Sequence, residues 1–287
     1  MSRRTTSLAV ASLAAASFVT FDPAPASAQV QKDHVDYALE IAENAVVNEW
    51  SSSTEGGCYI NWEEPSETHP AWSASTKAAC FFTLSLRKAM GYSPADLYNM
   101  WDSTSPTSDY YFQLISMSPA LGAPTPWVET HFRRVTKAVD IQKGDVLVVG
   151  LVRENGDEDG DGIRDEVLYS GHTVMITGPA VELTRQIMPR YSGTKQYMVP
   201  IVDSTNSPHG CDLGEYSDSR CATGEGGIGV GYMRVYTDSS TDILLGYTWS
   251  LTSSLKSYES PSKQPYRIAR LVKLPPPEST EPPPPPP

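Results

Sequence analysis

Three residues in the middle of the chain have the side-chain types of a cysteine nucleophile, its base and an orienting acid. Cys80 lies in "STKAACFFTLSLRKAMG", where a polar approach becomes an apolar, helix-forming run. His172 begins the apolar run "HTVMIT", and Asp203 ends "PIVD". A thiolate nucleophile needs a base that takes its proton and a polar group that holds the base in place. This order predicts attack by Cys80, proton transfer by His172 and orientation of His172 by Asp203.

The elements around these residues are of the kind that could bring them together. Ser75 or Thr76 can cap a helix that ends at Gly91, so Cys80 falls near a helix N-terminus, where unpaired N–H groups favour a thiolate. The backbone N–H of Cys80 would then contribute to an oxyanion hole. The glycine before His172 permits a close approach of other backbone or of substrate. If the strands that carry His172 and Asp203 are neighbours, the carboxylate can reach the imidazole.

The remaining pattern predicts an α+β domain in which N-terminal helices pack on a largely antiparallel sheet. Helical spacing runs over residues 34–50, residues 58–76 are irregular, and a second, short helix follows over residues 93–101. In the irregular part, Tyr59, Trp62 and Trp72 are candidates to line a cleft or to pack. The strands are predicted in "GDVLVVGLV", "SGHTVMITG", "QYMVPIVDST", "IGVGYMRVYT", "DILLGYTWSL" and "YRIARLVKL", with a hairpin across "DSST".

Over residues 71–205 these motifs resemble the NlpC-type superfamily of papain-like cysteine hydrolases. The features that carry the resemblance are "ACFFTLSLRKAMG", "DIQKGDVLVV", "GHTVMITG" and "IVDST". The resemblance implies a papain-like fold and a secreted enzyme that cuts an amide bond, most often in cell-wall peptides. Two departures stand out. Ala79-Cys80-Phe81-Phe82 replaces the usual Asp-Cys-Ser-Gly-Phe, and the gap from His172 to Asp203 is longer than usual, so Glu182 and Asn206 are alternatives for the third residue.

The chain contains four cysteines, and their pairing bears on the function. Cys211 and Cys221 flank a short polar loop and are predicted to form a local disulfide. Cys58 and Cys80 remain, and they could pair with each other. Such a disulfide would favour an alternative function, a catalytically inactive exported binding module stabilised by calcium, because an oxidised nucleophile cannot attack.

An acidic loop at residues 153–169 separates the predicted strand "GDVLVV" from the strand of His172. Alternating carboxylates can direct several oxygens at one hard cation, and calcium takes about 6–8 of them. The sequence therefore predicts a structural calcium site, with an empty solvated hairpin as the alternative. Its candidate ligands are Asp157, Asp159, Asp161 and Asp165. A second register, through Asn155, Asp157, Asp159, Gly160 and Glu166, also fits the spacing.

The two ends of the chain read as processing and linker segments. Residues 1–28 have the arginines, apolar run and small residues of a secretory signal peptide, and residues 275–287 form a polyproline tail. Residues 29–274 are then expected to form one domain, secreted or periplasmic. The net charge of −12 disfavours nucleic acid as a partner, and no later apolar run is long enough to span a membrane. A peptide or peptidoglycan-like substrate is the expected partner.

Overall fold

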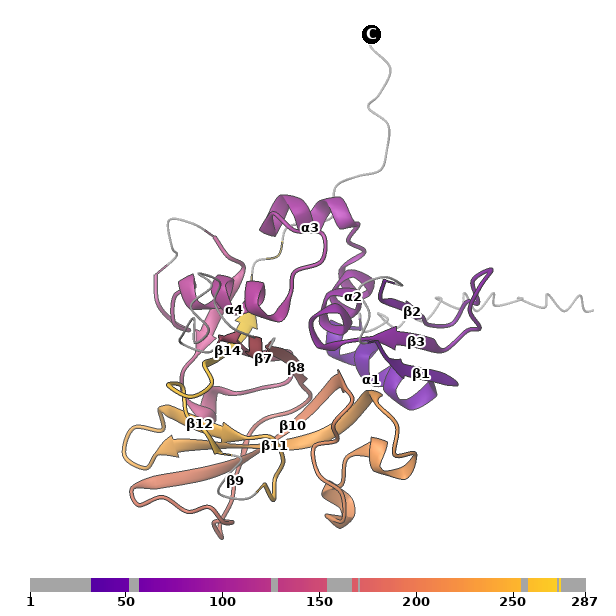
Figure 1. Cartoon of the computed structure of the whole chain (residues 1–287). Helices are drawn as coiled ribbons and strands as arrows, with labels where there is room; N and C mark the ends of the chain where they lie inside the picture. Colours follow the sequence, from indigo (N-terminus) through magenta and orange to yellow (C-terminus); the bar gives the residue numbers. More distant parts are fainter. Residues whose placement is uncertain are drawn as a thin grey trace, which may run out of the picture. The chain divides into compact units, whose positions relative to one another are not determined.

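The structure is a computed structural model, which describes residues 32–51, 57–124, 129–153, 167–169, 171–253, 258–272 and 274. These residues form one compact unit. This unit contains helices as well as strands, and the strands form both small and large sheets (Figure 1). The helices are α1 (His34–Asn44), α2 (Ala78–Met90), α3 (Pro94–Trp101) and α4 (Ser108–Met117), with short 3-10 turns at Ala138–Asp140, Gly214–Tyr216 and Ser219–Ala222.

The main sheet has the order β13-β12-β11-β10-β8-β5-β14-β4, with β9 beside β10, and each of its strand pairs is antiparallel. This confirms a mixed α+β structure with a largely antiparallel sheet. The strands are β4 (Phe132–Val135), β5 (Asp145–Val149), β8 (His172–Ile176), β9 (Val181–Glu182), β10 (Thr194–Thr205), β11 (Gly227–Asp238), β12 (Leu244–Thr248), β13 (Tyr258–Glu259) and β14 (Tyr266–Leu271). The predicted hairpin is present as β11 and β12.

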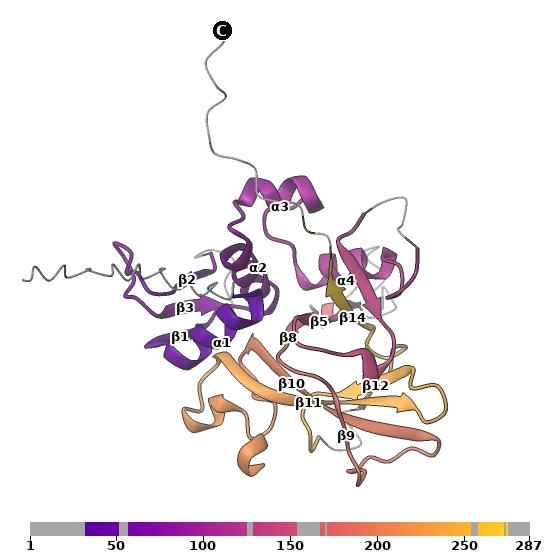
Figure 2. The same cartoon turned by 180° about the vertical axis from the view of Figure 1, so that it is seen from behind.

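The N-terminal helices cover one face of this sheet, as expected from the order of elements. α2 packs against β8 and β10, and α4 packs against β5, β14 and β4. Figures 1 and 2 show α1 and α2 side by side, next to a small sheet of β1 (Val47–Trp50), β2 (Tyr59–Asn61) and β3 (Ser73–Thr76). They also show α4 beside β14. The apolar side of α2 supplies Phe81, Phe82 and Leu86, which are almost fully buried. Burial of such large side chains stabilises the domain and fixes the start of α2 over β8.

Two predictions about the N-terminal region were wrong. The predicted helix 34–50 ends at Asn44, and β1 (Val47–Trp50) pairs in parallel with β3 (Ser73–Thr76). The adjacent β-branched Val46 and Val47 favour an extended backbone, which explains the early helix end. The irregular segment 58–76 contains β2 (Tyr59–Asn61) as well as β3, and these two strands pair antiparallel. The result is a small sheet next to the helices.

The cap predictions for α2 are confirmed only at its C-terminus. Gly91 adopts the left-handed conformation with φ of 70°, but the N-cap is Lys77, which makes no side-chain cap, rather than Ser75 or Thr76. Both predicted cap residues instead belong to β3, since sheet pairing keeps them extended. The first-turn N–H groups of α2 therefore have no capping side chain.

The structure describes only the residues on either side of the predicted acidic loop. β6 (Val152–Arg153) pairs antiparallel with β7 (Val167–Tyr169), which is the base of a hairpin. The predicted ligands Asp157, Asp159, Asp161 and Asp165 lie outside the described residues. So do the predicted signal peptide and the polyproline tail. None of the described helices is both long and apolar enough to span a bilayer.

Candidate active site

His172 and Asp203 lie together, as the sequence predicted for neighbouring strands. β8 and β10 pair antiparallel, and Nε2 of His172 lies 2.6 Å from Oδ2 of Asp203. Both side chains are buried, with His172 at 7% exposure and Asp203 at 0%. A carboxylate on Nε2 fixes the plane of the imidazole and favours a proton on that nitrogen. Among the described residues, the other ring nitrogen of His172 has no hydrogen-bond partner.

Gly171 allows the backbone before His172 to pass close to its neighbours. Its φ is +88°, a left-handed conformation that glycine adopts without strain. A Cβ atom at this position would lie 2.8 Å from the carbonyl oxygen of Val149 and 3.1 Å from Cβ of Ser108. The close approach predicted from the sequence is therefore to strand β5 and helix α4, and it sets the start of β8.

Cys80 lies in the first turn of α2, and it lines the same cavity as His172. The cavity has a volume of about 720 Å³, and the first residues of α2, Ala78 and Ala79, also line it. Cys80 is paired in a disulfide with Cys58, with 6.4 Å between their Cα atoms. In this state Cys80 is neither a thiol with a proton to donate nor a thiolate that could attack. The pairing that the sequence left open is thus the one in the structure.

The cavity wall offers many hydroxyl and amide groups and three large aromatic rings. The aromatic residues are Trp50, Tyr247 and Trp249. The predicted cleft residues are elsewhere: Trp62 and Trp72 pack on the core, and Tyr59 stacks on His69 with 3.8 Å between ring centroids. Their positions in and beside the small sheet explain the difference. The hydroxyls and amides come from Ser105, Thr107, Ser108, Ser204, Thr205, Asn206, Ser207 and Gln264.

The two alternatives for the third residue occupy different places. Glu182 lies on β9, where its carboxylate is 3.8 Å from Nζ of Lys195. Asn206 lines the cavity but is exposed, and the hydrogen bond to His172 comes from Asp203. The geometry among these three residues therefore favours Asp203.

Asp203 is enclosed by His209 and Arg220, two neighbours that sequence inspection missed. Nε2 of His209 lies 2.9 Å from the same Oδ2, and Nη1 of Arg220 lies 2.9 Å from Oδ1. The N–H bonds of that Nη1 point at backbone carbonyls, including that of Gly227, so its contact with Oδ1 is ionic and not a hydrogen bond. Burial alone would raise the pKa of the Asp203 carboxyl, but His209, Arg220 and the two histidine hydrogen bonds hold it well below its usual range.

The segment that carries His209 and Arg220 includes the loop closed by the predicted disulfide, with His209 just before Cys211. Cys211 and Cys221 are bonded, which confirms that prediction. Within the loop, Asp218 pairs with Arg220 through two contacts of 2.9 and 2.6 Å. The segment folds against β11 at two glycines. A Cβ at Gly229 would lie 2.7 Å from Nε of Arg220, and one at Gly231 would lie 2.9 Å from Cβ of His209.

The "GVG" of β11 was therefore the sequence signal for this neighbourhood. Alternate glycines in a strand indicate that another backbone or side chain approaches closely. A single sequence cannot say which residues approach, because His209 and Arg220 lie outside the strands, in a segment whose path the local pattern does not specify.

His172, Asp203 and His209 are also close enough to be tested as a metal site. One ligand atom from each lies within 4.8 Å of the others. However, the two histidine nitrogens already contact one oxygen of Asp203 at hydrogen-bond distance, and Arg220 provides a cation at the other oxygen. A divalent ion would have to displace these two hydrogen bonds, and it would lie close to the Arg220 cation. These contacts fit a hydrogen-bonded ionic cluster better than a metal centre.

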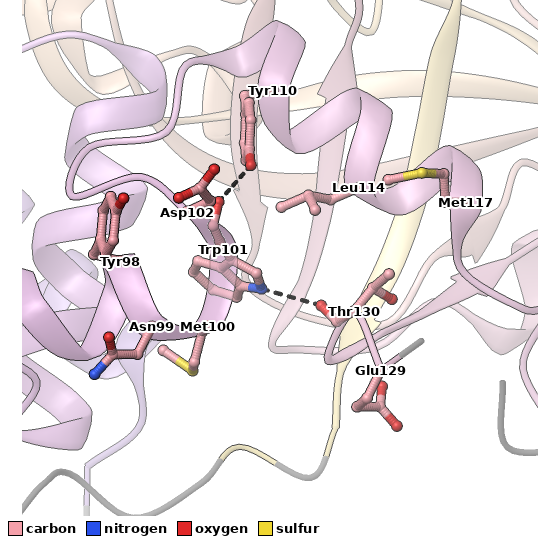
Figure 3. A pocket seen from close by; sticks show the side chains of 10 residues that line it. All are labelled: Tyr98, Asn99, Met100, Trp101, Asp102, Tyr110, Leu114, Met117, Glu129 and Thr130. Carbon is pink, nitrogen blue, oxygen red and sulfur yellow. Dashed lines mark hydrogen bonds between the residues drawn. The ribbon is translucent and has the colours of Figure 1, made fainter. Parts of the chain in front are cut away.

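A second cavity lies between α3, α4 and residues 129–130, with a volume of about 480 Å³ (Figure 3). Trp101 donates through Nε1 to the carbonyl of Thr130 at 3.1 Å, and Tyr110 donates to the carbonyl of Trp101. The carboxylate of Glu129 is held by both terminal nitrogens of Arg133, at 2.8 and 2.9 Å. The lining of this second cavity includes neither histidine nor cysteine. Of the two cavities, only the first is lined by both Cys80 and His172.

Comparison with known proteins gives one distant relative and no assignment. The chain is 23% identical over 214 residues to "Uncharacterized protein R653" of Acanthamoeba polyphaga mimivirus, an alignment that covers 73% of this chain and 83% of the viral protein. No protein-family model matches the chain. No solved structure matches it either.

Proposed function

We propose that the protein is a papain-like cysteine hydrolase, exported from the cell, that cleaves an amide bond and is latent while Cys80 is paired with Cys58. The observation that carries the proposal is the buried hydrogen bond from His172 to Asp203 at the cavity that Cys80 also lines. The resemblance of residues 71–205 to the NlpC-type superfamily adds a cell-wall peptide as the proposed substrate. The disulfides agree with export to an oxidising compartment.

The ionic cluster behind His172 favours an enzyme over an inert domain. The side chains of this cluster are almost fully buried, since Asp203, Asp218 and Arg220 are each 3% exposed or less. Burial of a charged group in a protein costs on the order of several kcal/mol per ion. Apolar side chains would stabilise this position at least as well. A cluster that ends at a histidine facing a cavity is expected where the protonation of that histidine matters.

Activation requires reduction of the Cys58–Cys80 disulfide. A thiolate of a dithiol reductant attacks one sulfur, a mixed disulfide forms, and the second thiol of the reductant resolves it. Two electrons pass to the cysteine pair, Cys58 and Cys80 become thiols, and the reductant leaves as a disulfide. The Cys80 proton then moves to Nδ1 of His172, which gives a thiolate at the helix N-terminus.

Catalysis would then proceed in two steps. The Cys80 thiolate attacks the carbonyl carbon, the C–N bond breaks, and His172 gives its proton to the leaving amine. Water, deprotonated by His172, attacks the resulting thioester, and the acid product leaves as the Cys80 thiol re-forms. The N–H groups at the start of α2, which have no side-chain cap, would stabilise the oxyanion of both steps.

Alkylation with iodoacetamide tests this proposal without knowledge of the substrate. The full chain is labelled at neutral pH before and after treatment with a dithiol, and each cysteine is followed by mass spectrometry. We expect Cys80 to be unlabelled before reduction and to react faster than Cys58 afterwards. His172→Ala should slow Cys80 but not Cys58, which serves as the internal control. Equal rates for both cysteines, unchanged in His172→Ala, would contradict a thiolate–imidazole pair.

The second candidate is a binding module that never uses its cysteine. The Cys58–Cys80 disulfide favours it, because it ties the start of α2 to the segment before β2 and would stabilise the cavity as a binding site. On this reading the reduced protein still fails to hydrolyse cell-wall stem peptides, and a Cys80→Ser variant binds them as tightly as the wild-type chain. Hydrolysis by the reduced chain, lost in Cys80→Ser, excludes this candidate.

A further inference from the structure

The hydrogen bonds of His209 require more protons than a neutral imidazole carries. Nδ1 lies 2.5 Å from the carbonyl oxygen of Trp249, which can only accept. Nε2 lies 2.9 Å from Oδ2 of Asp203, which is also an acceptor when the carboxylate is ionised. Both ring nitrogens of His209 must then donate, unless Asp203 holds a proton of its own.

The surrounding charges decide between these two possibilities. Arg220 contacts both carboxylates of the cluster, Asp203 and Asp218, and it is 3% exposed. One arginine cannot balance two buried carboxylates. A doubly protonated His209 supplies the second positive charge, and the four residues together become neutral. Buried charge is tolerated where it is compensated in this way.

The aromatic packing holds His209 in this position. Its ring stacks on Trp249 with 4.1 Å between centroids and 24° between planes. The same Trp249 meets the ring of His172 edge-on, at 4.9 Å and 65°. His209 is completely buried, and its backbone N–H donates to Asp218 at 2.8 Å. Trp249 thus lies against both histidines that share Asp203.

We propose that His209 is a positioning residue of the site: it stays doubly protonated at neutral pH and, with Arg220, holds Asp203 as a carboxylate that accepts from Nε2 of His172. Nδ1 of His172 then remains the basic nitrogen, which is the nitrogen that takes the Cys80 proton. This role rests on the proposed hydrolase, whereas the charge of His209 does not. The groups that face His209 are Asp203 on β10, Asp218 and Arg220 in the disulfide loop, and His172 across Asp203.

The inference is tested by NMR on the full, non-reduced chain with ¹⁵N-labelled histidine. At pH 7 we expect two protonated ring nitrogens on His209, and in neutral His172 a proton on Nε2 only. In His209→Gln, which can donate to Asp203 but carries no charge, the ring ¹⁵N signals of His172 should shift because a nearby cation is lost. The matched control is His34→Gln, which removes another buried histidine and should leave the His172 signals unchanged.

Several outcomes would overturn this role. They are a single protonated nitrogen on His209 at pH 7, or unchanged ring ¹⁵N signals of His172 in His209→Gln. If that variant does not fold, the wild-type spectrum still decides the charge of His209. A stoichiometric divalent metal in the purified protein, together with histidine signals that shift when the metal is chelated, would also overturn the role. A metal ion would then bind His209 where the proposal has a proton. None of these readouts needs reduced Cys80, so they fail or succeed separately from the alkylation test.

Discussion

Arg220 holds Asp203 from the side opposite to the histidines: its Nη1 lies 2.9 Å from Oδ1, while His172 and His209 share Oδ2. This arrangement encloses a carboxylate completely in protein. A buried ion that loses its partner is strongly destabilising, because the remaining charge has no solvent.

We therefore expect Arg220→Leu to lower the free energy of unfolding by about 3–5 kcal/mol. Urea denaturation at pH 7 measures it. The control is Lys263→Ala, which removes an exposed ion pair with Glu259 and should cost no more than about 1 kcal/mol. A loss in Arg220→Leu as small as that of the control would mean that Asp203 is not held by charge.

His34 should make the stability of the protein fall between pH 6.5 and pH 4. Burial lowers its pKa to about 4 in the folded state, while the unfolded value stays near 6.5. In this window the unfolded chain binds a proton that the folded chain does not, so stability is lost as the pH falls, by about 3 kcal/mol. In His34→Leu this part of the pH dependence should disappear. The measurement is urea unfolding at several pH values for both proteins, and parallel curves would contradict the assignment.

Gly171→Ala should destabilise the protein more than the same change at Gly193. Both glycines have positive φ, +88° and +73°, but a Cβ at Gly193 has open space around it. The control therefore loses only the cost of a left-handed alanine, about 1–2 kcal/mol. Gly171→Ala adds the clash with the Val149 carbonyl oxygen and should displace His172. Thermal unfolding compares the two variants. Equal losses of stability would show that β5 moves away from the added Cβ without a cost in free energy.

Calcium should stabilise the protein if the acidic loop binds it. At a concentration one hundred times its dissociation constant, a bound ion adds about 2.7 kcal/mol to the free energy of unfolding. We expect the melting temperature to rise in millimolar calcium and to fall with a chelator. The variant with both Asp157→Asn and Asp159→Asn should lose this response, and magnesium is the control ion. A melting temperature indifferent to calcium and chelator would show that the loop holds no ion of consequence.

The sequence was most informative where one local pattern dictates one local structure. The αL position after α2 was predictable from Gly91, and the start of α3 was predictable from Ser93 followed by Pro94. The apolar, β-branched runs predicted β5, β8 and β10, and β5 and β8 are buried at every position. Residues 45–50 were misread because Val47–Trp50 is extended by pairing with β3, which is a contact across 26 residues.

In the candidate site, too, some features were predictable from the sequence and others only from the tertiary structure. The chain alone supplied the residue types and order of Cys80, His172 and Asp203, since nucleophile, base and acid are recognisable as chemistry. Only the tertiary structure decided that Asp203 contacts His172, because that depends on β8 and β10 being neighbours. It also decided that Cys58 reaches Cys80 and that His209 and Arg220 enclose Asp203. Such contacts arise from packing between distant segments, which no local sequence pattern specifies.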